Sequence, residues 1–286
     1  MRVALVANPD SGRGVAARQV AERLRGLGAD VVLCERGWEG DERERALASD
    51  AERVIAAGGD GIIGPCALLA GELGVPLAVV PVGTANDFAR HHDLPRDLEG
   101  ACRLAIDGGR TQGYEIAYMG ERPFVNAASA GLSPVAARRA KPLKKAMGAL
   151  AYAAGAAYAG FTAQPLPITA EVDGHGVARG RAWQVIVACT GAFGAGSNVE
   201  DADAGDGLLD IVAIPAGSRR RLPRMAWALR RGDIARRPGV VHARGNEITL
   251  DVASGAEFNV DGEVVPAGAG KVRFTVRADA YQLVVR

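Results

Sequence analysis

The sequence predicts a two-domain α/β protein, in which an N-terminal doubly wound parallel sheet is followed by a C-terminal β-rich sandwich. Its 286 residues exceed one average domain of about 100–150 residues. The first part alternates short β-branched runs with helical stretches, which is typical of a parallel sheet with helices on both faces. From about Ile116 the pattern changes to short strands separated by turn residues, which is typical of a mostly antiparallel sandwich.

The first domain begins with a buried strand. Val3–Ala7 is an apolar run, and Val15–Leu27 has helical spacing with Arg and Glu on its outer face. Val31–Cys34, Val54–Ala57 and Leu77–Pro81 follow as further strands. In sheets of this kind, ligands bind beyond the carboxyl ends of the strands.

The second domain is predicted to be rich in short strands, with two helical interruptions at Leu143–Phe161 and Leu222–Arg231. We expect the domains to be residues 1–117 and 118–276, with the C-terminal segment 277–286 packing back on the first. The predicted strands are Phe124–Ala128, Ile168–Val172, Trp183–Cys189, Leu208–Ile214, Glu247–Val252, Glu257–Val260 and Val272–Val276.

Composition and charge exclude several classes of protein. Hydrophobic residues make up 48% and charged residues 23%, which is ordinary for a globular protein and argues against disorder. Residues 1–117 carry 13 basic and 18 acidic side chains, whereas 118–286 carry 21 and 15. This mild imbalance argues against general nucleic-acid binding and would suit an anionic membrane surface, although an ordinary solvated surface explains it somewhat better.

Cysteine usage and hydropathy indicate the compartment. The four cysteines are scattered without a close pair, which favours reduced thiols in the cytoplasm. Apart from the adjacent His91 and His92, the histidines have no metal-ligand spacing. The run Val3–Ala7 is too short for a signal-peptide core. The Ala- and Gly-rich run Ala146–Phe161 falls short of the roughly 18–20 apolar residues of a membrane span, and is expected to be a buried helix.

Three glycine-rich segments each follow a predicted strand: Asn8–Gly14, Gly58–Gly61 and Pro81–Arg90. Small residues after a strand allow backbone N–H groups and a helix N-terminus to approach an anion without Cβ clashes. Tight turns and helix caps, with Thr84 or Asn86 as N-cap, explain the same residues without a ligand. None of the segments is a dinucleotide fingerprint or a Walker P-loop.

Taken in order, Asn-Pro-x-Ser-Gly-x-Gly, Gly-Gly-Asp-Gly and Pro-x-Gly-Thr-Ala-Asn-Asp-Phe-Ala-Arg resemble the catalytic family of diacylglycerol kinases, whose relatives include sphingosine, ceramide and bacterial lipid kinases. The resemblance covers essentially the whole chain. In the second half it rests on Phe124-Val125-Asn126, Gly131, Gly148, Tyr152, Gly194-Ala195-Gly196, Asp206-Gly207-Leu208-Leu209-Asp210 and Asp261-Gly262-Glu263.

The resemblance implies an NAD kinase/diacylglycerol kinase-like fold, in which the α/β domain binds ATP and the β-rich domain helps to bind a lipid. It implies ATP and Mg²⁺ as cofactors, with transfer of the γ-phosphoryl group to a hydroxyl of diacylglycerol or a similar lipid alcohol, as in phospholipid metabolism. The nucleotide-binding residues would be Asn8, Ser11, Gly12, Gly58, Gly59, Asp60, Gly61, Ile62, Thr84, Asn86 and Asp87.

Carboxylates carry the remaining expectations that the resemblance implies. Asp60 and Asp87, with Glu115 where the family usually has Asp, would form an acidic network around Mg²⁺. Asp206, with the backbone carbonyls of Asp203 and Leu208, matches a structural Mg²⁺ site of the bacterial members.

Asp261 matches the proposed general base of the family. A lipid hydroxyl is a poor nucleophile, so a carboxylate that accepts its proton helps the O–P bond to form. Asp-Gly between strands is also a strong hairpin signal, and without the other motifs a turn residue is the better interpretation.

The family pattern is broken at four further positions besides Glu115. Ile62 and Pro65 stand where the family has Thr and Glu, and loss of one phosphate hydrogen bond would cost about 1.5–3 kcal/mol. Gly205 and Glu200 stand where many members have Asp and Pro, which puts the structural metal in doubt. Two alternatives therefore remain open: a kinase of the same fold acting on a soluble alcohol or NAD, and a catalytically weakened binding or regulatory homologue.

The expected substrate is a lipid or lipid-like alcohol, and a second copy of the chain is expected as partner in a homodimer. Binding of nucleic acid is not expected. Peripheral contact with the inner membrane surface is a further expectation, because basic residues flank both predicted helices of the second domain. Solvated helix faces explain the same charges. These residues are Arg138, Arg139, Lys141, Lys144, Lys145, Arg219, Arg220, Arg221, Arg224, Arg230, Arg231, Arg236 and Arg237.

Overall fold

The computed structural model describes residues 1–7, 17–35, 41–143, 150–194, 197–199, 202, 205–268 and 270–286. It divides the chain into two compact units, Met1–Ile116 with Ala278–Arg286, and Ala117–Arg277. The division falls inside two strands, β5 (Arg110–Met119) and β17 (Lys271–Val285). The first unit is therefore discontinuous in the sequence.

The first unit contains a parallel sheet in the order β2-β1-β3-β4-β17. Only the C-terminal end of β17 takes part, where Leu283 pairs with Leu77. The other elements of this unit are β1 (Arg2–Ala7), α1 (Ala17–Gly26), β2 (Asp30–Glu35), α2 (Asp41–Leu47), β3 (Arg53–Gly58), the short 3₁₀ helix η1 (Asp60–Ile62), α3 (Ile63–Leu73), β4 (Leu77–Pro81), α4 (Asp87–His91) and α5 (Leu98–Asp107).

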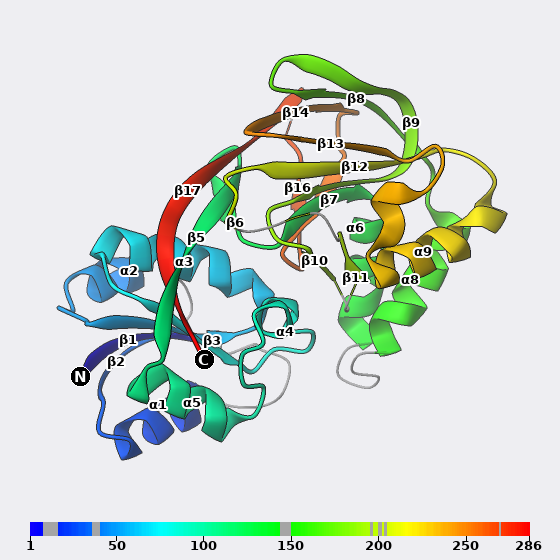
Figure 1. Ribbon diagram of the computed structural model, residues 1–286. Coiled ribbons are helices and arrows are strands. Elements are labelled where there is room, and N and C mark those ends of the chain that lie inside the picture. Colours follow the sequence, from blue (N-terminus) through cyan, green and yellow to red (C-terminus); the bar gives the residue numbers. More distant parts are fainter. Residues whose placement is uncertain are drawn as a thin grey trace. The chain divides into compact units, whose positions relative to one another are not determined.

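Helices cover both faces of this sheet, with α1 and α5 on one side and α2 and α3 on the other (Figure 1). Alternate residues of β1 serve the two sides. Val3 and Leu5 pack with Val20 and Leu24 of α1 in one apolar cluster, while Ala4 and Val6 are buried on the opposite face. Strands buried on both faces are typical of parallel sheets, and this accounts for the continuous apolar run at the N-terminus.

The second unit is built from antiparallel strands in the order β16-β15-β7-β9-β8-β14-β17, with β12 paired to β9 and β13. Its elements are β6 (Arg122–Phe124), β7 (Ala127–Gly131), α6 (Leu132–Ala140), η2 (Lys141–Leu143), α8 (Leu150–Thr162), β8 (Leu166–Val172), β9 (His175–Ala188), β10 (Ala192–Phe193), β11 (Ser197–Asn198), β12 (Leu209–Pro215), η3 (Arg219–Arg221), α9 (Leu222–Arg231), η4 (Asp233–Arg236), β13 (Val241–Gly245), β14 (Glu247–Val252), β15 (Glu257–Val260) and β16 (Glu263–Pro266).

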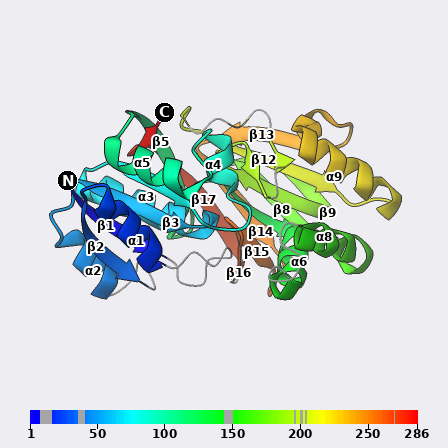
Figure 2. The same ribbon diagram turned by 90° about the horizontal axis from the view of Figure 1, so that it is seen from below.

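Strands of this unit enclose one apolar core, in which Phe274 lies 6.4 Å from Phe124 and 5.7 Å from Phe258, measured between ring centroids. Helices α6 and α9 cover the other face of the strands, and α8 packs on α6 (Figure 2). The predicted fold class, a parallel α/β sheet with a β-rich second part, is confirmed. No helix within the described ranges is long and apolar enough to cross a membrane.

Candidate active site

Two glycine-containing turns follow the neighbouring strands β3 and β4. The carbonyl oxygen of Gly58 accepts hydrogen bonds from the N–H groups of Val82 and Gly83, both at 3.1 Å. A Cβ atom on Gly83 would lie 2.3 Å from the Cα atom of Gly59, so the two backbones are in direct contact. Glycine permits this approach because it has no side chain. The structure thus brings together two of the segments that the sequence predicts to hold phosphates.

Asn86 fixes the second turn. Its backbone is left-handed, with φ of 51°, a conformation that Asn tolerates better than most residues. Its side-chain Nδ2 donates hydrogen bonds to the carbonyl oxygens of Pro81 (3.3 Å) and Gly83 (3.0 Å). Its Oδ1 is buried and has no hydrogen-bond partner among the described residues. Buried polar atoms are usually paired, so this oxygen suits a donor or cation carried by a ligand, beside the partly exposed Thr84.

Asp60 and Asp87 form a pair of carboxyl groups next to these turns. Asp60 Oδ1 accepts a hydrogen bond from the N–H of Phe88 at 2.9 Å, in the first turn of α4. Burial, and then the like charge of Asp87, raise the pKa of Asp60 to about 6, against the effect of its N–H donors. Asp87 is buried, and its Oδ1 accepts a hydrogen bond from Arg90 Nη1 at 2.7 Å. The pair therefore concentrates negative charge that an added cation would relieve.

This pair fits the protein's share of a Mg²⁺ site. Mg²⁺ is usually held by one or two carboxylates together with substrate phosphates and water. The third predicted member, Glu115, is buried within β5. No group of three acidic, His or Cys side chains suited to a metal is found in the part of the chain that the structure describes. A metal at Asp60 and Asp87 would thus depend on phosphates for further ligands, and the role of Glu115 stays a prediction.

Ile62 and Pro65, which break the family pattern, have structural roles at the start of α3. A Cβ atom on Gly58 would lie 2.6 Å from Cδ1 of Ile62, so the isoleucine side chain packs directly against this glycine. Pro65 stands in the first turn of α3, where a backbone N–H has no intrahelical partner to lose. The two residues support the turn but supply no hydroxyl or carboxylate to a ligand.

Asp261 occupies the turn of the β15–β16 hairpin. It and Gly262 are the two residues between the paired Val260 and Glu263, and both have positive φ, at 45° and 91°. This is the geometry expected of Asp-Gly in a two-residue hairpin turn. The turn interpretation of Asp261 therefore holds in the structure.

The Asp261 side chain has a second set of contacts. Its Oδ1 accepts hydrogen bonds from the N–H groups of Asn126 and Ala127, each at 3.0 Å, and its Oδ2 accepts one from Val125 at 2.9 Å. Three N–H donors stabilise the ionised carboxylate and fix its orientation. The base role stays a prediction, but the carboxylate also holds the segment that leads into β7.

A buried polar network behind this segment was missed by sequence reasoning. Thr190 Oγ1 donates a hydrogen bond to Asn126 Oδ1 at 3.2 Å and accepts one from the N–H of Ala192 at 3.1 Å. The carbonyl oxygen of Asn126 accepts a hydrogen bond from the N–H of Cys189 at 2.9 Å. The sequence signal was a polar Asn126 inside the apolar run Phe124–Ala128, within the motif Phe124-Val125-Asn126 of the resemblance.

Asp206 has an arginine partner. Its Oδ2 accepts a hydrogen bond from Arg244 Nη2, and its Oδ1 accepts one from the N–H of Leu208 at 2.9 Å. Arg244 Nε also contacts the fully buried Asp210, 3.2 Å away, whose carboxylate lies 2.6 Å from His242 Nε2. Arg244 can balance the charge of Asp206, so the predicted structural Mg²⁺ is not required for that purpose.

Gly61 lies in η1, beside Asp60. Four predicted site residues fall outside the described ranges. These are Asn8, Ser11 and Gly12 in the first glycine-rich segment and Asp203 at the predicted structural metal. Their assignments stay predictions.

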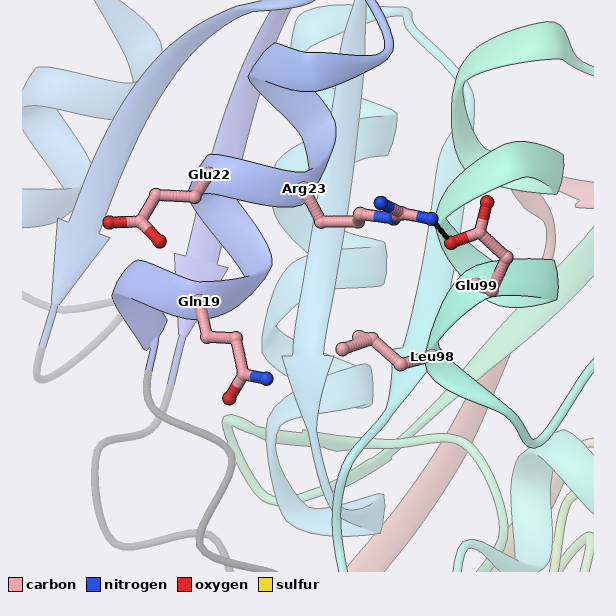
Figure 3. A pocket seen from close by; sticks show the side chains of 5 residues that line it. All are labelled: Gln19, Glu22, Arg23, Leu98 and Glu99. Atoms are coloured by element: carbon pink, nitrogen blue, oxygen red, sulfur yellow. Dashed lines mark ion pairs between the residues drawn. The ribbon is translucent and has the colours of Figure 1, made fainter.

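An open surface pocket of about 480 Å³ lies between α1 and α5, and none of its lining residues is among those predicted for catalysis. It is lined by Gln19, Glu22, Arg23, Leu98 and Glu99 (Figure 3). Arg23 forms an ion pair with Glu99 across this pocket, and Glu99 also accepts a hydrogen bond from Arg103 Nε at 2.7 Å. This pairing explains the charged lining without a ligand.

Comparison with known families matches both parts of the chain. Residues 2–117 match the diacylglycerol kinase catalytic domain, and residues 126–285 match the YegS C-terminal NAD kinase beta sandwich-like domain. A diacylglycerol kinase from Staphylococcus epidermidis is 30% identical over 282 residues, covering 92% of this chain and 85% of the relative.

Solved structures share the fold. A crystal structure from Bacillus anthracis strain Sterne has a TM-score of 0.77 at 20% identity, covering 100% of this chain and 97% of that one. A second structure from that strain, described as a diacylglycerol kinase, has a TM-score of 0.67 at 17% identity with the same coverage. At these identities the structural likeness concerns the fold alone.

Proposed function

The chain belongs to the diacylglycerol kinase family, and from this premise we propose that it transfers the γ-phosphoryl group of ATP to a hydroxyl of diacylglycerol or a similar lipid alcohol. The observation that carries the proposal is the pair of glycine turns after β3 and β4, with the carboxyl groups of Asp60 and Asp87 beside them. Turns of this kind, at the carboxyl ends of parallel strands, suit the binding of phosphates.

In this proposal, the backbone of the turns positions the phosphates. Gly59 and Gly83 have no Cβ atoms, so the two turns can lie in direct contact. Asn86 holds the second turn through its hydrogen bonds to the carbonyl oxygens of Pro81 and Gly83. Phosphoryl transfer depends mainly on positioning and electrostatic stabilisation. A rigid backbone surface therefore does much of the catalytic work.

Asp60 and Asp87 would hold Mg²⁺, which when bound would neutralise charge on the phosphates. Asp60 must be ionised for this role, and its raised pKa makes that dependent on pH near 6. Arg90, which bonds to Asp87 Oδ1 and to the carbonyl oxygen of Ala85, orients the second carboxylate.

Asp261 would accept the proton of the acceptor hydroxyl. Its three N–H donors keep the carboxylate oriented, so that little reorganisation is needed when the proton moves. The same donors occupy positions on both carboxylate oxygens, so the hydroxyl would approach a remaining lone pair.

Two alternatives compete with this proposal. The first is a kinase that uses the same turns to bind ATP but phosphorylates a soluble alcohol or NAD. A weakened homologue is favoured by Ile62 and Pro65, which supply packing and a helix start in place of ligand-binding groups. The names of the relatives favour a lipid acceptor.

An acceptor screen tests the proposal. Purified full-length protein is incubated with γ-labelled ATP and Mg²⁺ against diacylglycerol, other lipid alcohols, soluble alcohols and NAD. Label transferred to a lipid alcohol supports the proposal. Transfer only to a soluble alcohol or to NAD supports the first alternative, and no transfer to any acceptor supports the second.

A further inference from the structure

The turn that leads into β12 is held by two side chains from the end of β13. The carbonyl oxygen of Gly207 accepts a hydrogen bond from Asn246 Nδ2 at 2.7 Å. Asp206 Oδ2 accepts one from Arg244 Nη2. Strand β13 pairs with β12 in antiparallel register, with Arg244 opposite Asp210, and this pairing brings the two side chains to the turn (Figure 1).

Arg244 binds two carboxylates at once. Its Nη2 binds Asp206, and its Nε donates a hydrogen bond to the carboxylate of Asp210 at 3.2 Å. The Asp210 side chain is fully buried, and His242 Nε2 lies 2.6 Å from one of its oxygens. A buried carboxylate needs a cation and hydrogen-bond donors to remain ionised. The position of the guanidinium group is therefore fixed from both sides.

The donor set around Asp206 does not fit Mg²⁺. This ion prefers oxygen ligands in octahedral geometry. Asp206 supplies a single carboxylate to the predicted site, because Gly205 stands where many members of the family have Asp. Its Oδ1 accepts the N–H of Leu208 at 2.9 Å, and its Oδ2 accepts Arg244. A dication on this carboxylate would lie close to the guanidinium charge and would be repelled by it.

We propose that Arg244 takes the place of the structural Mg²⁺ that the resemblance implies, so that the second unit is stable without a divalent metal. A metal would join the turn to its surroundings through ligand bonds, whereas Arg244 and Asn246 join it to β13 through hydrogen bonds. The competing interpretation is that Mg²⁺ binds here and that Arg244 forms only a surface ion pair, of the kind that contributes little to stability.

Removal of metal from the full-length protein is the first test, and it needs neither ATP nor an acceptor. Thermal unfolding is measured in EDTA and in excess Mg²⁺, and bound Mg²⁺ is determined by elemental analysis after desalting. Asp60→Asn is measured beside the wild type, because this substitution weakens the Mg²⁺ site proposed at the glycine turns. We expect Asp60→Asn to unfold at the same temperature in both solutions and to contain only substoichiometric Mg²⁺.

Substitution of Arg244 is the second test. Arg244→Ser leaves the buried Asp210 without its guanidinium partner and should lower the unfolding temperature in EDTA by about 5–10 °C. Arg244→Lys keeps the charge and should recover part of this loss. Arg273→Ser is the matched control, since Arg273 forms an exposed ion pair with Glu247 at 2.9 Å in the same unit and should change the unfolding temperature little.

Asp206 distinguishes an arginine partner from a metal. If Arg244 is its partner, Asp206→Asn should destabilise the wild type but cause no further loss in Arg244→Ser, because both substitutions remove the same ion pair. If Asp206 instead holds a metal, its replacement should cost as much stability without Arg244 as with it. Where Arg244→Ser does not fold, Arg244→Lys takes its place in this comparison.

Several results would overturn the proposal. Stoichiometric Mg²⁺ in desalted Asp60→Asn would do so, as would an unfolding temperature of this variant that EDTA lowers and Mg²⁺ restores. Equal stability of Arg244→Ser and the wild type would reduce the arginine to an ordinary surface ion pair. Equal losses from Asp206→Asn with and without Arg244 would assign Asp206 to a metal. Each of these readouts is a stability or a metal content, so the outcome is independent of the proposed kinase activity.

Discussion

The environment of the Asp60 carboxyl group disfavours its ionised form, although backbone N–H groups donate hydrogen bonds to it. The carboxyl group accepts a hydrogen bond from the N–H of Phe88, while burial and Asp87 raise its pKa from 3.8 to about 6. A raised pKa means that the folded state binds the proton more tightly than the unfolded state does. The resulting stabilisation is present below about pH 4 and is lost as the pH rises through about 6.

Asp60→Asn should therefore be more stable than the wild type at pH 8 and much less active. The amide oxygen still accepts the Phe88 hydrogen bond, but the unfavourable charge is gone, and a shift of about two pKa units is equivalent to at most about 3 kcal/mol. Denaturant unfolding at pH 8 and pH 4 measures the difference. Asp60→Ala is the control, because it loses the acceptor and should not be stabilised. If Asp60→Asn is no more stable than the wild type at pH 8, the ionised Asp60 does not destabilise the folded state.

The same group predicts the pH dependence of nucleotide use. Protonated Asp60 cannot bind Mg²⁺ well, so kcat/KM for Mg²⁺-ATP should rise with pH through an inflection near 6. Asp60→Asn should lack this inflection in its residual activity. An identical pH profile in the wild type and the variant would assign the titration to another group.

Asp261→Asn should lose phosphoryl transfer and some stability while still binding ATP. The amide cannot accept the substrate proton, and its NH₂ group would oppose one of the three backbone N–H donors, at a cost of about 1–3 kcal/mol. Turnover and thermal unfolding are measured together, with ATP binding as the check on folding. A variant that is destabilised yet retains turnover would leave Asp261 with its structural role alone.

At the level of elements, substitutions at the two glycines of the turns after β3 and β4 can separate a role in packing from a role in ligand binding. A methyl group on Gly83 would meet the Cα atom of Gly59 at 2.3 Å, which forces the turns apart. A methyl group on Gly59 would meet Gly83 at 3.4 Å, close to an ordinary contact.

Gly83→Ala should therefore lose both stability and nucleotide binding, whereas Gly59→Ala should fold normally and bind nucleotide more weakly. Thermal unfolding and nucleotide titration of the two variants measure the difference. Normal nucleotide affinity in a well-folded Gly59→Ala would place the phosphates elsewhere.

Apolar patterns predicted most of the strands, although their bounds were inexact and several other elements, such as α6 and β16, were missed. The buried run Val3–Ala7 lies in β1 because parallel strands covered on both faces are continuously apolar. The predicted helix at Leu143–Phe161 corresponds to α8 at Leu150–Thr162, and residues 144–149 lie outside the described ranges. A further helix, α6 at Leu132–Ala140, was missed, because its small and basic residues do not form a clear apolar pattern.

The longest strand shows a different limit. The sequence predicts a strand at Val272–Val276, whereas β17 runs from Lys271 to Val285 and contributes to both units. Its polar middle, at Arg277–Asp279, has no apolar pattern to mark it as a strand. The strand continues through this polar part because its backbone pairs with neighbouring strands, and the side-chain pattern carries no signal of that pairing.

At the scale of the whole molecule, order along the chain predicted more than any single motif. Each glycine-rich segment has a turn or cap interpretation of its own, but their sequence order identified the family, and this identification is confirmed. Long-range contacts were beyond the sequence. Nothing in it indicates that Arg244 reaches Asp206 or that Asp261 holds residues 125–127, because these partners are 38 and 134–136 positions apart.

Transfer of labelled γ-phosphate from ATP to diacylglycerol in mixed micelles, compared between the wild type, Asp60→Asn and Asp261→Asn, tests the proposed function most directly. We predict Mg²⁺-dependent transfer by the wild type and a loss of at least about a hundredfold in both variants, since each removes a group that acts in the transition state. Absence of transfer by folded, ATP-binding wild-type protein, or transfer that survives both substitutions, would contradict the proposed kinase mechanism.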